Sequence, residues 1–95
     1  MFVVLLRFSR NKDHAHRLME AHKQWIDRGF HDGVFLLAGS LKPSLGGAIL
    51  AHNASLPELQ NRVNEDPFVA EDVVSVDILE ITPSKADERL TLLLG

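Results

Sequence analysis

The apolar positions between residues 13 and 29 recur every three or four residues, at Ala15, Leu18, Met19, Trp25 and Ile26. This spacing predicts an amphipathic helix over Asp13–Gly29. We expect Asn11 or Asp13 to cap its start, and Gly29 to take a left-handed conformation at its end. His22 lies in the middle of the apolar stripe, where a buried imidazole needs a hydrogen-bond partner.

Four runs rich in Val, Leu, Ile and Phe predict strands, at Phe2–Phe8, Val34–Leu41, Gly47–His52 and Val73–Ile81. A loop with Pro43 joins the second and third strands as a hairpin. A second helix is predicted over Ser55–Asn64, because Ser55 and Glu58 have the spacing of a capping box. It ends before the Asp66-Pro67 step, since the residue before proline avoids helical geometry.

The element order is strand, helix, strand, strand, helix, strand. Two right-handed crossover units of this kind interleave into a four-stranded antiparallel sheet with both helices on one face. The sequence therefore predicts an α+β protein with the ferredoxin-like fold. Its length of 95 residues provides material for one hydrophobic core, so we expect a single domain over residues 1–95.

The first two strands are apolar on both of their faces, although two helices cover only one face of a sheet. A large open apolar face favours association, so we expect a homodimer in which a second copy covers it. The end of the chain, residues 83–95, includes the apolar run Leu90–Leu94. This tail is expected to pair with a sheet edge or with the partner subunit.

Composition narrows the class of protein. The chain is 45% hydrophobic and 24% charged, as soluble globular proteins are, and its net charge of −3 argues against nucleic acid as a partner. The apolar run at the N-terminus is interrupted by Arg7, so neither a signal peptide nor a membrane span is expected. With no cysteine in the sequence, a reduced cytoplasmic setting fits best.

Little in the sequence points to a metal or a cofactor. No two of the five histidines have the i, i+4 spacing that binds zinc on a helix, and no His-Glu-x-x-His pattern occurs. Gly46-Gly47 is not followed by the lysine of a phosphate-binding loop. We therefore expect no metal and no cofactor. His14 and His16 are interpreted as solvated, His31 as a turn residue and His52 as the end of the third strand, without a functional role.

Three polar residues remain as candidates for chemistry, and each has a plain structural explanation. By position alone, His22 fits a core histidine bonded to a backbone carbonyl. Asp66 fits an ordinary cap for the turn that begins at Pro67. Ser40 fits a strand-end hydroxyl, because no Gly-x-Ser-x-Gly nucleophile motif surrounds it.

The combination of these residues resembles the YciI-like (YCII-related domain) family, small proteins of the dimeric α+β barrel type. The similarity extends in order and spacing from Phe2 to Pro83. It is carried by His22 within MEAHKQWI, by Ala38-Gly39-Ser40, and by the segment Asp66-Pro67-Phe68-Val69-Ala70. Two positions depart from the family pattern: Ser40 stands where proline is frequent, and Glu71 where glycine is frequent.

The resemblance implies a pocket in which His22 and Asp66 form a catalytic pair. We expect Gly39, Ser40, Trp25 and Phe68 to bind the substrate, with Leu18 and Phe35 adding to an apolar wall. Aspartate would orient the imidazole, whose second nitrogen then acts as general acid or base. Elimination, isomerisation or hydrolysis of a small, partly apolar metabolite is the chemistry within reach.

A second function from a different class remains open. The same cleft would serve a non-catalytic dimeric module that binds a small molecule, or an accessory subunit. The ferredoxin-like fold hosts both kinds of protein, so the fold does not decide between them. An open pocket with the two side chains in hydrogen-bond reach favours the enzyme, and a sealed His22 bonded only to backbone favours the module.

Overall fold

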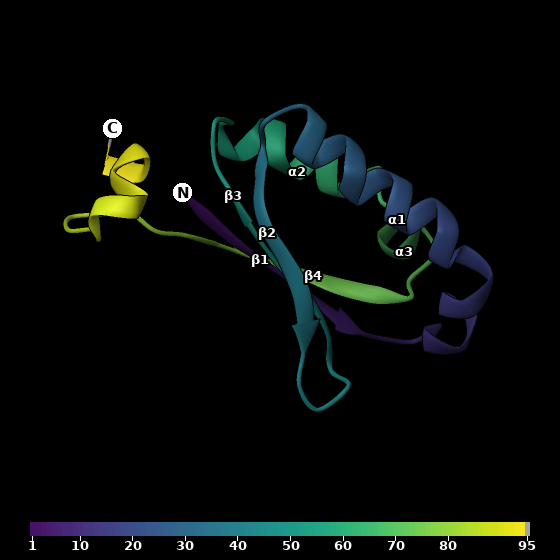
Figure 1. Ribbon diagram of the computed structural model, residues 1–95. Helices are drawn as coiled ribbons and strands as arrows, with labels where there is room; N and C mark the ends of the chain where they lie inside the picture. Colours follow the sequence, from purple (N-terminus) through teal and green to yellow (C-terminus); the bar gives the residue numbers. More distant parts are fainter. Residues whose placement is uncertain (95) are drawn as a thin grey trace.

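The computed structural model describes residues 1–94 and is built around a four-stranded antiparallel sheet of order β2-β3-β1-β4. Its strands are β1 (Phe2–Phe8), β2 (Phe35–Leu41), β3 (Gly46–Ala51) and β4 (Val74–Glu80). Its helices are α1 (Ala15–His31), α2 (Leu56–Asn64) and α3 (Pro67–Ala70), with 3-10 turns η1 (Lys12–His14) and η2 (Glu88–Leu94). All three helices lie on one face of the sheet (Figure 1). The predicted ferredoxin-like α+β fold is confirmed.

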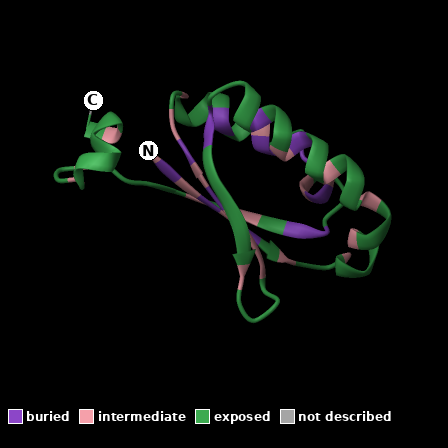
Figure 2. Ribbon diagram, viewed as in Figure 1, coloured by how far each residue is buried: buried purple, intermediate pink, exposed green. Residues whose placement is uncertain are grey.

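The register of the sheet separates a core face from an open face. On the helix side, Ala38, Ile49, Val4 and Ile78 form one row across the four strands. Val4 and Ile49 are fully buried there under Trp25 of α1 and the apolar residues of α2 (Figure 2). On the other side, the row consists of Leu37, Leu50, Val3 and Leu79. The side chains of Leu37 and Leu79 are both more than half exposed.

The ends of α1 differ from the prediction. The helix runs two residues past Gly29, and it is Gly33, at φ +74°, that takes the left-handed conformation. Gly29 is needed for space instead, because a Cβ there would lie 2.1 Å from the Phe35 ring. Neither expected side chain caps the start of the helix. Asn11 instead donates its amide to the carbonyl oxygen of Glu71, 2.9 Å away.

Replacing Gly29 by alanine is expected to destabilise the fold. Overpacking a core costs about 1–3 kcal/mol, which exceeds the roughly 1 kcal/mol that alanine gains over glycine within a helix. The Phe35 ring cannot move aside freely, because it is buried and packed edge-on against Trp25. Chemical denaturation would measure the loss, with exposed Gln24→Ala on the same helix as the control. A more stable Gly29→Ala protein would contradict this account.

The capping box predicted at the start of α2 is confirmed. The Ser55 hydroxyl accepts from the Glu58 backbone N–H at 3.2 Å, and the Glu58 carboxylate accepts from the Ser55 backbone N–H at 2.8 Å. The backbone N–H and then the hydroxyl of Ser55 hold the pKa of Glu58 below its usual value. The ionised carboxylate is therefore the form that stabilises the helix end.

This box makes a pH-dependent contribution to stability. A carboxyl group with a lowered pKa stabilises the fold above its unfolded pKa, and the contribution is lost as pH falls through the folded pKa. Glu58→Gln should therefore have a lower Tm than the wild type near about pH 7, with the gap closing toward about pH 3. A gap that stays constant over this range would show that the charge of Glu58 plays no part.

The C-terminal segment differs from the prediction that it pairs with an edge of this sheet. It forms the turns of η2, stands apart from the sheet and helices (Figure 1), and joins no strand within residues 1–94. Leu90, Leu92 and Leu94 are each about half exposed. Contact of this tail with a partner subunit stays a prediction. None of the helices in residues 1–94 combines the length and the apolar character that a membrane crossing requires.

Candidate active site

His22 and Asp66 meet at the junction of α1 and α3. The His22 Nδ1 atom lies 2.8 Å from Asp66 Oδ1, although 44 positions separate the two residues in the chain. The Asp66 side chain is completely buried, whereas 12% of the His22 side chain is exposed. His22 is thus bonded to a carboxylate, not to a backbone carbonyl, and its ring reaches the surface of a pocket.

The local sequence holds Asp66 in place. Asp66 precedes proline and has the extended backbone that this position favours, with φ −65° and ψ 123°. From there its Oδ1 atom accepts the backbone N–H of Phe68 at 3.0 Å and caps α3. The same turn brings the Phe68 ring parallel to the imidazole, with 3.9 Å between ring centroids and 4° between planes. One short segment therefore fixes both the position and the tilt of His22.

The hydrogen bonds define which nitrogen of His22 is available. If Asp66 is ionised, its carboxylate only accepts hydrogen bonds, and Nδ1 is then the nitrogen that donates to it. The lone pair is then on Nε2. Asp66 Oδ2 is buried and has no hydrogen-bond partner among the residues that the structure describes. Apart from the Phe68 N–H, His22 is the group that compensates this carboxylate.

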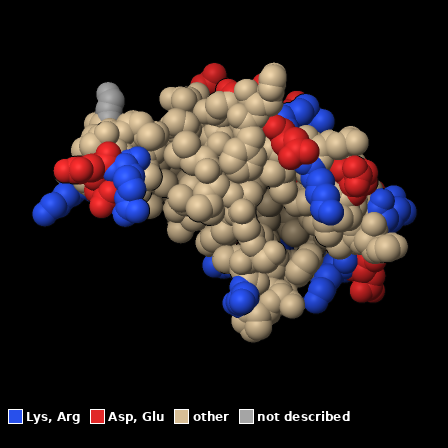
Figure 3. All heavy atoms as spheres, in the orientation of Figure 1, with Lys and Arg blue, Asp and Glu red and all other residues tan. Residues whose placement is uncertain are grey.

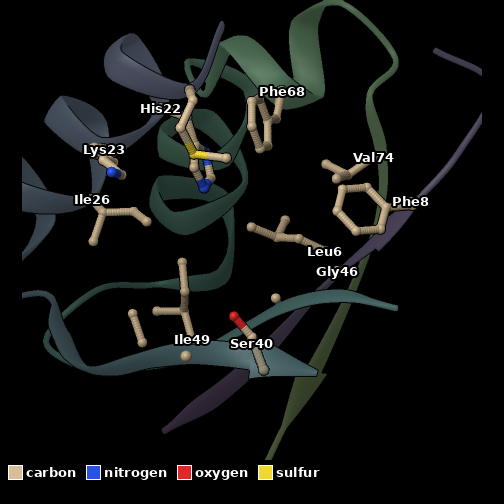
Figure 4. A pocket seen from close by; sticks show the side chains of 15 residues that line it. Leu6, Phe8, His22, Lys23, Ile26, Ser40, Gly46, Ile49, Phe68 and Val74 are labelled. Carbon is tan, nitrogen blue, oxygen red and sulfur yellow. The ribbon is translucent and has the colours of Figure 1, made fainter. Parts of the chain in front are cut away.

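The pocket beside His22 lies between α1 and the sheet and has a volume of about 290 Å³. Figure 4 shows the His22 ring extending from the helix side and the Ser40 hydroxyl pointing into the same space from the strand below. The walls are largely apolar. They are formed by Leu6, Phe8, Met19, Ile26, Ala38, Ala48, Ile49, Phe68 and Val74, with Gly39, Gly46 and Gly47 at the strands. A small, partly apolar molecule suits such a lining.

Three of the four residues expected to bind substrate line this pocket: Gly39, Ser40 and Phe68. Trp25 does not, and that expectation is corrected. Its side chain is buried, and its indole Nε1 donates to the carbonyl oxygen of Arg62 in α2 at 2.9 Å. Trp25 packs beside His22 in the core, with 5.9 Å between the ring centroids, and this contact helps to fix the position of the imidazole. Leu18 and Phe35 also belong to the core instead of the pocket wall.

Sequence reasoning missed Lys23, which directly follows His22 and lines the pocket. Met19 and Ile26 were assigned to the apolar stripe without being placed at the pocket. The i−3 and i+4 spacing from His22 to these two residues was a usable signal, because such residues share one face of a helix. The signal for Lys23 was weaker, since a lysine beside the apolar stripe is usually solvated. Within residues 1–94, no three His, Asp or Glu side chains gather closely enough to hold a metal ion.

The fold and this pocket define a ferredoxin-like α+β protein with a histidine–aspartate pair at its candidate site. The chain belongs to the YCII-related domain family, whose model matches residues 1–82. A comparison with curated proteins found no match.

A solved structure shares the fold. It is 5-chloro-2-hydroxyhydroquinone dehydrochlorinase (TftG) from Burkholderia phenoliruptrix AC1100, in complex with 2,5-dihydroxybenzoquinone. The TM-score is 0.69 at 15% sequence identity, over 85% of this chain and 93% of the dehydrochlorinase. At this identity the similarity shows the fold alone.

Proposed function

We propose that the protein is a small acid–base enzyme in which His22 takes up and returns a proton and Asp66 holds His22 in position. The observation that carries the proposal is the 2.8 Å contact between His22 Nδ1 and a completely buried carboxylate, at the wall of an open pocket. A core histidine needs only a backbone acceptor. Burying a carboxylate against the ring is costly, and it is useful when the ring must carry a proton.

The proposed reaction begins with proton abstraction from a carbon next to a carbonyl or similar group. The His22 Nε2 lone pair takes the proton, and the C–H electron pair moves into the neighbouring unsaturated group. His22 becomes an imidazolium whose charge Asp66 compensates. The electron pair then either expels a leaving group, which completes an elimination, or accepts a proton at another atom from His22, which completes an isomerisation. In hydrolysis, His22 Nε2 instead takes a proton from water while the water oxygen bonds to an electrophilic carbon, and the imidazolium then returns that proton to the leaving group as its bond to the carbon breaks.

Elimination is the first of these reactions to test. The structural neighbour is by name a dehydrochlorinase, and it was solved with a quinone that carries two hydroxyl groups. In this chain, the apolar walls and the Ser40 hydroxyl would receive a compound of comparable size. We propose that Gly39, Ser40 and Phe68 contact such a substrate, and that the pocket accepts small rings with few polar substituents.

We also propose that the protein is a homodimer that buries the open face of its sheet, which would complete a dimeric α+β barrel. The support is the apolar row Leu37, Leu50, Val3 and Leu79, which crosses all four strands on the face without helices. In the view of Figure 3, the surface over β2 lacks Lys, Arg, Asp and Glu side chains. A two-fold contact would place this row against itself.

Deuterium exchange tests the proposed chemistry without a known substrate. The protein is incubated in D₂O with a mixture of small carbonyl compounds, hydroquinones and halogenated hydroquinones, and the mixture is analysed by mass spectrometry. We expect deuterium at a carbon of at least one compound, or loss of a leaving group, with the wild type and not with His22→Gln. Binding of a compound without any exchange would favour the non-catalytic module and would overturn the enzyme.

A further inference from the structure

We propose that Lys23 selects ligands with a negatively charged oxygen, so that the substrate is a small apolar compound with one carboxylate or comparably acidic group. This inference rests on the proposed function, because it assigns the substrate class of the same pocket. It starts from the charges that line the cavity. Among the lining residues that the structure describes, Lys23 is the one Lys or Arg, and none is Asp or Glu.

One carboxylate, Asp66, lies next to the pocket without lining it. Asp66 lies beneath His22, is completely buried, and is not part of the lining. A second ammonium group lies behind one wall, since Lys12 Nζ is 5.0 Å from the centroid of the Phe8 ring, which lines the pocket. Among the lining residues that the structure describes, the charge that a ligand meets directly is therefore that of Lys23. Apolar walls strengthen its effect on a ligand, because they replace water around the charges.

Lys23 also forms no ion pair with another of the residues that the structure describes. Glu20 and Asp27 stand at i−3 and i+4 from it on α1, a spacing that often gives salt bridges. Within residues 1–94, however, Lys23 is in no salt bridge, whereas Arg7, Arg17, Arg62 and Arg89 each contact a carboxylate. Charged side chains of both signs gather over α1 in Figure 3. Of the Lys, Arg, Asp and Glu residues in the described part of the chain, Lys23 is the one that lines the pocket.

The arrangement of polar groups indicates how a ligand lies. Lys23 stands beside His22 on the helix side, near Ile26, and the Ser40 hydroxyl points in from the strand opposite (Figure 4). At about 290 Å³, the pocket lies at the lower end of the roughly 300–1,000 Å³ that is usual for ligand pockets, so it suits a small molecule such as one substituted ring. Its apolar body would contact Phe68 and Ile49, with its anionic group toward Lys23 and a reacting carbon near His22 Nε2.

Benzoate and benzamide test this inference, since they share size and shape and differ in charge. Binding is followed by NMR of the labelled His22 ring during titration of the full-length protein. We expect benzoate to bind about two- to five-fold more tightly than benzamide, as for a partly exposed ion pair. Lys23→Met should remove this preference and Lys23→Glu should reverse it. Lys85→Met, which makes the same charge change in the C-terminal segment, should keep it.

Three outcomes would overturn the inference: equal affinity for the two compounds, an unchanged preference in Lys23→Met, or no response of the His22 signals to either compound. Failure of the proposed function has a different signature. A benzoate preference that depends on Lys23, with no deuterium exchange in any compound tested, would leave an anion-binding pocket without catalysis. Exchange that depends on His22 but acts on neutral compounds alone would keep the enzyme and remove the role of Lys23.

Discussion

His22→Gln and Asp66→Asn are each expected to lower turnover by about 10²–10⁴-fold, the usual cost of losing a general acid–base group. Glutamine has no titrating nitrogen to take the proton. Asparagine keeps an oxygen that accepts from Phe68 and from His22 Nδ1, but it lacks the charge that compensates the imidazolium. The rate is measured on the compound that exchanges deuterium. The controls are His16→Gln on the exposed side of α1 and Glu65→Gln beside the pair.

The protonation state of the ring gives an independent check of this prediction. Nitrogen-15 chemical shifts distinguish the two nitrogens of a neutral imidazole. We expect a proton on Nδ1, which faces Asp66, and a bare Nε2, which faces the pocket. If Nε2 carried the proton at neutral pH, it could not act as the base. Full activity of either variant would likewise remove the pair from the mechanism.

Leu37→Asp together with Leu79→Asp is expected to convert a dimer into a folded monomer. Both side chains lie on the open face and are more than half exposed in a single subunit. A charge at these positions therefore lowers the folding stability of the isolated subunit only slightly. In the proposed interface, each new carboxylate would be desolvated near its two-fold mate, which costs several kcal/mol. Light scattering at micromolar concentration measures the mass. Leu45→Asp, in the exposed turn between β2 and β3, is the control.

Val4→Asp provides the contrast, because it introduces the same charge on the opposite face of the sheet. Val4 directly follows Val3, a member of the open-face row, but its side chain points toward the helices. Val4 is fully buried beneath the helices, and an unpaired charge there costs on the order of 4–5 kcal/mol, a large part of the stability of a small domain. We expect loss of the circular dichroism signal of the fold, not merely loss of the dimer. A wild type of monomer mass, or a double variant that remains dimeric, would contradict the proposed interface.

The sequence predicted the features that depend on local chemistry. The order of the elements followed from apolar periodicity, and the capping box at Ser55 and Glu58 followed from a spacing of three residues. His22 was singled out by its place on an apolar stripe, and Asp66 was named as its partner by the resemblance to the YciI-like family. Residue spacing alone could not show that the two touch, because the contact depends on how α1 and α3 cross above the sheet.

The errors share one physical cause, which is that packing between elements overrides local preference. Gly29 was assigned to a helix end because glycine favours the left-handed conformation, yet it is there to admit the Phe35 ring. Trp25, which follows His22 by three residues on the apolar stripe, was expected to bind substrate, yet its indole N–H is bonded to the carbonyl oxygen of Arg62 in α2. In both cases the deciding neighbour belongs to another element, β2 for Gly29 and α2 for Trp25, and helix periodicity carries no information about it.

The Asp66 Oδ1 atom is hydrogen-bonded both to His22 Nδ1 and to the backbone N–H of Phe68 in α3. The geometry of the candidate site therefore depends on this one helical turn being formed. Unwinding of α3 would break the bond from the Phe68 amide to that oxygen and would also move the stacked phenyl ring. Loss of this one turn would therefore remove two supports of the imidazole together. The exchange rate of a single backbone hydrogen, on Phe68, would therefore report how often the molecule is ready to act.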